Sequence, residues 1–142
     1  MRNYLDASFV ISLYSLDANS AAAARTMHNS KGEHVISALC ELEVANALEL
    51  RAFRKEISSA QARASAVAFE KDLRDGIFRL QPVTEEAFEK ARQLSRQYTA
   101  RLGTRTADLL HVAAALILQA DRLYTFDQHQ RKLAVAVRLK LN

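Results

Sequence analysis

The sequence has little of several residue types that mark particular classes of protein. It holds one cysteine, Cys40, so no disulfide can form within the chain, and a reducing cytoplasm is the expected location. Only three glycines and one proline are present, which predicts few turns and much helix. The longest apolar run, VAAALIL at 112–118, is far shorter than the ~20 residues that a membrane span needs. These absences predict a helix-rich cytoplasmic protein without a membrane segment.

Length and charge narrow the expectation further. A chain of 142 residues is expected to form one domain, residues 1–142. The formal net charge of +4 and the isoelectric point near 9.5 suit a nucleic-acid partner or an acidic protein partner. An ordinary basic surface without such a partner has the same composition, so charge alone does not decide between them.

Segments typical of strands alternate with segments typical of helices along the whole chain. This order predicts an α/β fold, with a mainly parallel central sheet of about five short strands flanked by helices on both faces. In the helix expected over 39–55, the spacing of Leu42, Ala45, Leu48 and Phe53 predicts one apolar face. Strands are expected at 2–5, 33–38, 77–83, 122–126 and 135–141, and helices at 7–16, 20–31, 39–55, 58–76, 85–102, 106–120 and 128–134.

Four acidic residues occupy comparable places in this pattern. Asp6 follows the first expected strand and Asp127 the fourth, while Glu43 and Asp108 lie near the beginnings of two helices. In open α/β sheets, ligands bind beyond the carboxyl ends of the strands. The four acids are therefore expected to reach the same rim of the sheet.

Each of these acids also has a simpler interpretation. Asp6 and Asp127 are good helix N-caps, and Gln130 would complete a capping box with Asp127. Glu43 is compatible with an exposed helix position. Asp108 is the least easily explained in this way, because it precedes the run LLHVAAALIL, which has almost no polar face.

Four stretches resemble the motifs of PIN domains, in the same order. They are YLDASFVISL, ISALCELEVANAL, TRTADLLHVAAAL and LYTFDQHQRKLA, and together they cover the whole chain. In the second motif, the run E-x-x-N-A-L selects Glu43 rather than Glu41. The length, with nothing appended, is similar to that of the VapC toxins of toxin–antitoxin pairs.

The resemblance implies a metal-dependent endoribonuclease that hydrolyses RNA phosphodiester bonds. Its Mg²⁺ or Mn²⁺ would be held by Asp6, Glu43, Asp108 and Asp127, with Glu43 either binding the metal directly or acting on a bound water. The physics of the acids agrees, because converging carboxylates must take up protons or bind a cation, and all-oxygen ligands suit Mg²⁺ and Mn²⁺. The resemblance also implies a homodimer and a cognate antitoxin protein that covers the site.

Other side chains near these acids have two interpretations. Ser8 and Thr125, each two residues from an aspartate, are candidates to orient the carboxylates or to form local turns. His111 is interpreted as a packed structural histidine rather than a catalytic one. Arg101 and Arg105 are candidates to contact RNA phosphates.

Two alternative functions are compatible with an α/β fold that carries an acidic rim. One is a PIN-like module that binds RNA or protein without cleaving it. The other is a receiver-type signalling domain, which is disfavoured because the first strand ends in a single acid, Asp6, and LYTFD contains no lysine.

Overall fold

Five parallel strands form the central sheet of the computed structural model, which describes residues 1–142. Their spatial order is β3-β2-β1-β4-β5, so the predicted parallel α/β fold is confirmed. The sheet places β1 at its centre, with β2 on one side and β4 on the other. The strands are β1 (Arg2–Leu5), β2 (Glu33–Ser37), β3 (Arg79–Gln81), β4 (Arg122–Tyr124) and β5 (Lys140–Leu141).

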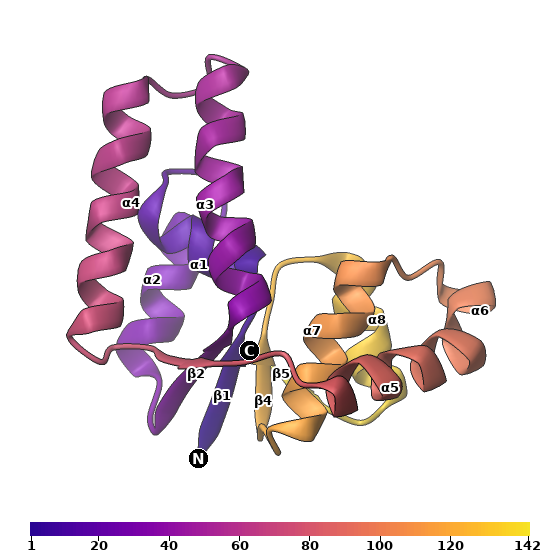
Figure 1. Cartoon of the computed structure of the whole chain (residues 1–142). Helices are drawn as coiled ribbons and strands as arrows, with labels where there is room; N and C mark the ends of the chain where they lie inside the picture. The colour runs from indigo at the N-terminus through magenta and orange to yellow at the C-terminus, as the bar shows by residue number, and fades with distance from the viewer.

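Helices connect the strands and cover both faces of the sheet (Figure 1). None of them combines the length and the apolar character that crossing a bilayer requires. The helices are α1 (Ala7–Tyr14), α2 (Ser20–Asn29), α3 (Ala38–Phe53), α4 (Ser59–Arg74), α5 (Glu85–Leu94), α6 (Ala100–Leu102), α7 (Thr106–Ile117) and α8 (Gln128–Ala136), with a π-helical segment, η1 (Ser95–Thr99), between α5 and α6.

Two adjacent residues of β1 divide the core into two layers. Successive side chains of a strand point to opposite faces. Leu5 packs with buried residues of α1 to α4, whereas Tyr4 packs with buried residues of α5, α7 and α8. Figure 1 shows the result as two groups of helices, one on each side of the sheet.

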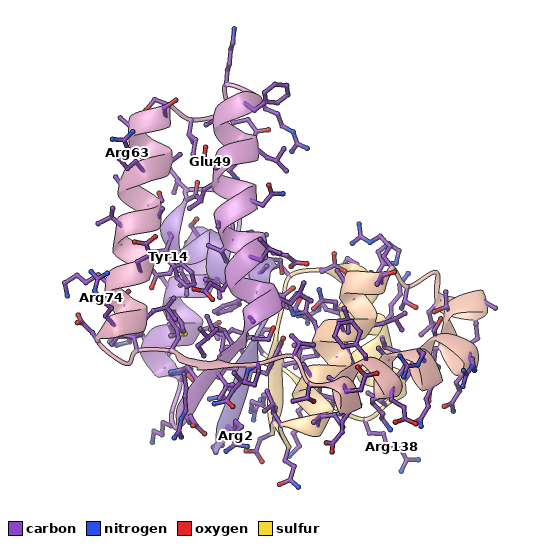
Figure 2. All side chains as sticks on the ribbon, viewed as in Figure 1. Arg2, Tyr14, Glu49, Arg63, Arg74 and Arg138 are labelled. Atoms are coloured by element: carbon purple, nitrogen blue, oxygen red, sulfur yellow. The ribbon has the colours of Figure 1, made fainter.

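The helices α3 and α4 form a hairpin that extends well beyond the sheet (Figure 1). Tyr14, at the end of α1, lies at its base (Figure 2). Its ring packs against Phe69 and Phe78, and its hydroxyl donates a hydrogen bond to Asp72 of α4. A capping box between Ser58 and Gln61 begins α4, as the sequence predicts. The base of the hairpin is therefore fixed to the layer that contains α1.

The last predicted strand, 135–141, is wrong over most of its length. The alternating pattern VAVRLKL is typical of a strand, but α8 continues to Ala136 because its buried Leu133 and Ala134 anchor it in the core. The backbone then closes the helix through bonds from Val137 N to Leu133 O and from Leu139 N to Ala134 O. Only Lys140–Leu141 pair with β4.

The predicted apolar face of α3 is right at Leu48, which is buried, and wrong at its other three positions. Leu42 and Phe53 are 67% and 83% exposed, whereas the buried residues of the helix are Cys40, Val44 and Leu48. The spacing i, i+4, i+8 of the buried set is the true helical stripe. The sequence contains enough leucine and alanine around α3 to support either choice of face, and only packing against α1 and α4 selects one.

The helix predicted over 85–102 is interrupted. It begins at Glu85, capped by Thr84, but changes to the π-helical segment η1 and ends with the single turn α6. Gly103, with φ +66°, closes it in the left-handed conformation that glycine adopts most readily. This closure directs the chain toward the beginning of α7.

Candidate functional site

Two of the four acids follow neighbouring strands at the centre of the sheet. Leu5 of β1 pairs with Tyr124 of β4, so Asp6 and Thr125 leave the sheet side by side. The backbone N–H of Asp6 donates to the carbonyl of Tyr124 over 3.1 Å, which continues the pairing for one further residue. Asp127 lies two residues beyond Thr125. The carboxyl ends of β1 and β4 therefore position Asp6 and Asp127 at one rim.

Asp6 is buried, 1% exposed, and its carboxylate is surrounded by donors. It caps α1 by accepting the N–H of Phe9 over 3.0 Å, and it accepts the hydroxyls of Ser8 and Thr125, each over 2.8 Å. Burial raises the pKa of Asp6, and this effect exceeds the opposing influence of the nearby His111 imidazole and of these hydrogen bonds. The fold thus contains a carboxylate whose charged form a further cation would stabilise.

Ser8 and Thr125 connect Asp6 to the loop that follows β4. The hydroxyl of Ser8 accepts the N–H of Phe126 over 3.0 Å, and that of Thr125 accepts the N–H of Asp127 over 3.0 Å. Both hydroxyls also donate to Asp6. Each hydroxyl therefore holds the Asp6 carboxylate and the backbone around Asp127 in fixed relative positions.

Asp127 caps α8 and keeps one carboxylate oxygen directed elsewhere. Its Oδ1 accepts the N–H groups of His129 and Gln130 over 2.8 and 3.0 Å. The predicted capping box is wrong, because the buried Oε1 of Gln130 has no hydrogen-bond partner. Oδ2 of Asp127 is not used by the cap and accepts a hydrogen bond from Arg105.

Arg105 joins Asp127 to Asp108. Its Nη2 is 2.8 Å from Asp127 Oδ2, and its Nε is 3.2 Å from Asp108 Oδ2. Asp108, in the first turn of α7 and almost fully buried, also accepts the backbone N–H of Arg105 over 2.9 Å. The two acids raise the pKa of Arg105, Asp108 having the larger effect. One guanidinium therefore shares its positive charge between two of the predicted site residues.

Glu43 reaches the site from the opposite layer. It lies in the second turn of α3, and its side chain is 31% exposed. Its Oε2 is 2.9 Å from Nε2 of His111, which lies on α7 one turn after Asp108. Glu41, which the sequence analysis did not select, forms no side-chain hydrogen bond or ion pair. The prediction of His111 as a buried residue is confirmed, since it is 0% exposed.

Arg101 lies apart from these contacts. It belongs to the short helix α6, and its guanidinium is 5.7 Å from the centre of the Tyr98 ring. Arg105 and Arg101 thus differ in the structure, because only Arg105 touches the acids. Both side chains are exposed, and their contacts with RNA phosphates remain a prediction.

The donor chemistry of the rim fits a hard divalent cation. Asp108 and Asp127 already share one positive charge, that of Arg105, and Asp6 is a buried carboxylate. Carboxylate oxygens are the ligands that Mg²⁺ and Mn²⁺ prefer. In this arrangement of side chains, no three His, Cys, Asp or Glu residues lie close enough together to hold a metal ion. Arg105 is the cation that Asp108 and Asp127 contact directly.

Sequence reasoning missed two contacts of the site. It assigned Arg105 to an RNA phosphate and not to Asp108 and Asp127, although an arginine three residues before an aspartate at a helix start is a usual ion-pair spacing. It also missed the bond between His111 and Glu43, which are 68 residues apart. No local signal in the sequence indicates that second contact.

One known family model matches most of the sequence. The family model described as PIN domain matches residues 4–136. A comparison with curated proteins finds no match.

Three solved structures share this fold over nearly the whole chain. VapC20 of Mycobacterium tuberculosis, a toxin that cleaves the sarcin–ricin loop, is 20% identical with a TM-score of 0.72, and the match covers 94% of each chain. VapBC2 of Rickettsia felis, bound to a DNA fragment from its promoter, is 15% identical with a TM-score of 0.67, over 100% of this chain and 98% of the other. FitAcB of Neisseria gonorrhoeae is 17% identical with a TM-score of 0.68, over 98% and 95%. At these identities the likeness concerns the fold.

Proposed function

The chain belongs to the PIN domain family, and on that premise we propose that it is a metal-dependent endoribonuclease, the toxin of a VapBC-type pair. The observation that carries the proposal is the linked set of acids at the carboxyl ends of β1 and β4 and in the first turn of α7. Thr125 connects Asp6 to the Asp127 backbone, and Arg105 connects Asp127 to Asp108. The structural likeness to VapC20, a cleaving toxin, supports the same function.

Asp6, Asp108 and Asp127 would hold the Mg²⁺ or Mn²⁺ ion, with Glu43 binding it directly or through water. When bound, such an ion supplies hydroxide at neutral pH and stabilises negative charge on the phosphate. Ser8 and Thr125 keep the Asp6 carboxylate in one orientation by their hydrogen bonds. Such bonds to a ligating carboxylate fix its direction.

Arg105 is placed to act both before and after a metal ion binds to the site. Its side chain is 66% exposed, so it can leave Asp108 and Asp127 without disturbing the core. A guanidinium released beside the site is well placed to bind an RNA phosphate through two N–H groups. Arg105 would thus balance the acids before the ion binds and contact the substrate afterwards.

The partners proposed with this function are RNA, a cognate antitoxin and a second copy of the chain in a homodimer, all in the cytoplasm. The similar structures VapBC2 and FitAcB support the antitoxin. The net charge of +4 supports binding to RNA, whose backbone is negatively charged. A basic residue of the antitoxin would pair with Asp108 or Asp127, as Arg105 does within the chain.

Cleavage of a defined RNA tests the proposal directly. Purified protein is incubated with a sarcin–ricin loop oligonucleotide and with total RNA, in Mg²⁺, in Mn²⁺ and in EDTA. We expect cleavage in either metal and none in EDTA. Asp108→Asn, purified in parallel, controls for a contaminating nuclease and should be inactive. RNA binding without cleavage under all conditions would favour the alternative function, a PIN-like module that binds but does not cut.

A further inference from the structure

A hydrogen-bonded network of four polar side chains crosses the interior of the protein and ends at Glu43. The hydroxyl of Tyr4 lies 2.8 Å from Ser37 Oγ and 2.9 Å from His111 Nδ1. Nε2 of His111 lies 2.9 Å from Glu43 Oε2. Ser37, Tyr4 and His111 are each 0% exposed, so only Glu43 reaches solvent.

This network connects the two layers of the fold. Tyr4 belongs to β1, His111 to α7, and Ser37 caps α3 by accepting the N–H of Cys40 over 3.3 Å. Glu43 lies in the same helix that Ser37 caps. The polar contacts therefore bind the beginning of α3 to the helix that carries Asp108.

The roles of donor and acceptor follow from the chemistry of the groups. A carboxylate only accepts hydrogen bonds, so Nε2 of His111 carries a hydrogen and donates it to Glu43. At the other ring nitrogen, Nδ1 lies against the Tyr4 oxygen, whose own hydrogen is donated to Ser37 Oγ. Fixing one ring nitrogen in this way determines what the other presents to its partner.

Glu43 differs from the three aspartates in how it is held. Asp6 and Asp127 are fixed by backbone N–H groups of the helices that they cap, and Asp108 by the N–H of Arg105. The side chain of Glu43 accepts one hydrogen bond, from His111. An acid on a long, partly exposed side chain with one tether depends on that tether for its direction.

We propose that His111 is a positioning residue that directs Glu43 toward the acidic rim, and that Tyr4 fixes the ring of His111. The proposal rests on the proposed function and assigns a role within the same site. The competing explanation is that His111 only fills space in the core, where its ring also packs edge-on against Tyr4 at a centroid distance of 5.9 Å.

Two substitutions of His111 separate these explanations. The amide nitrogen of His111→Gln lies close to the place of Nε2 and keeps a donor for Glu43, whereas the shorter His111→Asn keeps a partner for Tyr4 but does not reach Glu43. Val112→Ala is the control for lost packing, because Val112 is buried on the same helix and does not contact Glu43. Tyr4→Phe removes only the hydroxyl that holds Nδ1.

The first measurement is Mn²⁺ affinity without RNA, by electron paramagnetic resonance of the free ion. We expect His111→Asn to weaken Mn²⁺ binding about 10- to 100-fold, as loss of a group that orients a ligand does, while His111→Gln and Val112→Ala stay close to wild type. The second is cleavage, in which His111→Asn should lower kcat by a similar factor and leave KM for RNA unchanged. In a Glu43→Gln background, His111→Asn should have no further effect on kcat.

The outcomes distinguish this inference from the function on which it rests. If wild type binds Mn²⁺ and cleaves RNA but His111→Asn behaves like Val112→Ala, the positioning role is overturned and the nuclease function stands. An additive loss in the Glu43→Gln background would overturn it in the same way. If wild type neither binds Mn²⁺ nor cleaves RNA, the proposed function falls and this inference with it.

Discussion

Arg105 Nη2 and Asp127 Oδ2 lie 2.8 Å apart and join α7 to α8 across the rim of the sheet. The same guanidinium contacts Asp108. Both contacts are ion pairs of a largely exposed arginine, so each contributes about 0.5 kcal/mol or less. Arg105 is therefore held firmly enough to balance the acids and weakly enough to be displaced.

Removing Arg105 should tighten metal binding. Because Arg105 and the ion would compete for Asp108 and Asp127, losing its two ion pairs, together at most about 1 kcal/mol, should strengthen Mn²⁺ binding up to about fivefold in Arg105→Ala. Titration of Mn²⁺ without RNA measures this. Arg101→Ala, which removes an exposed arginine that touches Tyr98 and no acid, is the matched control and should not change the affinity. Weaker binding in Arg105→Ala would show that the arginine supports the metal site.

Neutralising Asp6 should not weaken the metal-free protein. Burial raises the pKa of Asp6 above its ordinary value of 3.8, so the folded state holds the proton more tightly than the unfolded state does. As the pH rises above that value, ionisation of Asp6 lowers the free energy of unfolding. Asp6→Asn should therefore melt at the same or a higher temperature than wild type in EDTA at pH 7, while losing RNA cleavage.

The pH dependence provides the check on this reasoning. The advantage of Asp6→Asn over wild type should shrink as the pH falls toward 3.8. Asp6 of wild type is then protonated in the unfolded state as well as in the folded state, so its ionisation no longer favours unfolding. Added Mn²⁺ should raise the melting temperature of wild type only. Melting of Asp6→Asn far below wild type at pH 7 would mean that the charge of Asp6 is needed for folding.

Substitutions of Glu43 and Glu41 should have very different effects. Glu43 contacts His111, which lies one turn after Asp108 on α7, whereas Glu41 forms no side-chain hydrogen bond or ion pair. Glu43→Gln should lower the cleavage rate by roughly 100-fold or more, in the range of a lost acid–base group, and Glu41→Gln should leave it unchanged. Initial rates on one RNA at fixed Mg²⁺ measure both. The opposite result would show that Glu41 belongs to the site.

Two substitutions of Asp127 should separate its role in the helix cap from its role in chemistry. Asparagine caps helices as well as aspartate does, so Asp127→Asn should keep the stability, whereas Asp127→Ala should lose about 1 kcal/mol and about 4 °C in melting temperature. Both should abolish cleavage. If the chain is a toxin, its induction should arrest growth, and both variants should relieve the arrest.

Growth after induction is compared at matched protein levels, with the cognate antitoxin as a further arm. The antitoxin should relieve arrest by wild type. Equal arrest by wild type and Asp127→Asn would show that toxicity does not depend on the acid. Arrest relieved only by Asp127→Ala would indicate that stability, rather than chemistry, explains the effect.

The sequence by itself determined the order of the elements and the places of the acids. Period and spacing identify β1, β2 and the buried helix α7 because these elements bury apolar residues in a regular pattern. The carboxyl ends of parallel strands meet at one edge, so Asp6 and Asp127 could be assigned to one rim without coordinates. Local chemistry also identified the caps, since Asp6 and Asp127 bond N–H groups within three residues of themselves.

The tertiary structure alone decided the contacts between distant elements. Which face of α3 is buried depends on α1 and α4, because Leu42 and Val44 are both apolar and only packing exposes the first and buries the second. The end of α8 depends on Leu133 in the core, which overrides the alternating pattern that follows it. The bond from His111 to Glu43 spans 68 residues, and no local pattern records it, because it joins two helices, α3 and α7, that pack in opposite layers of the fold.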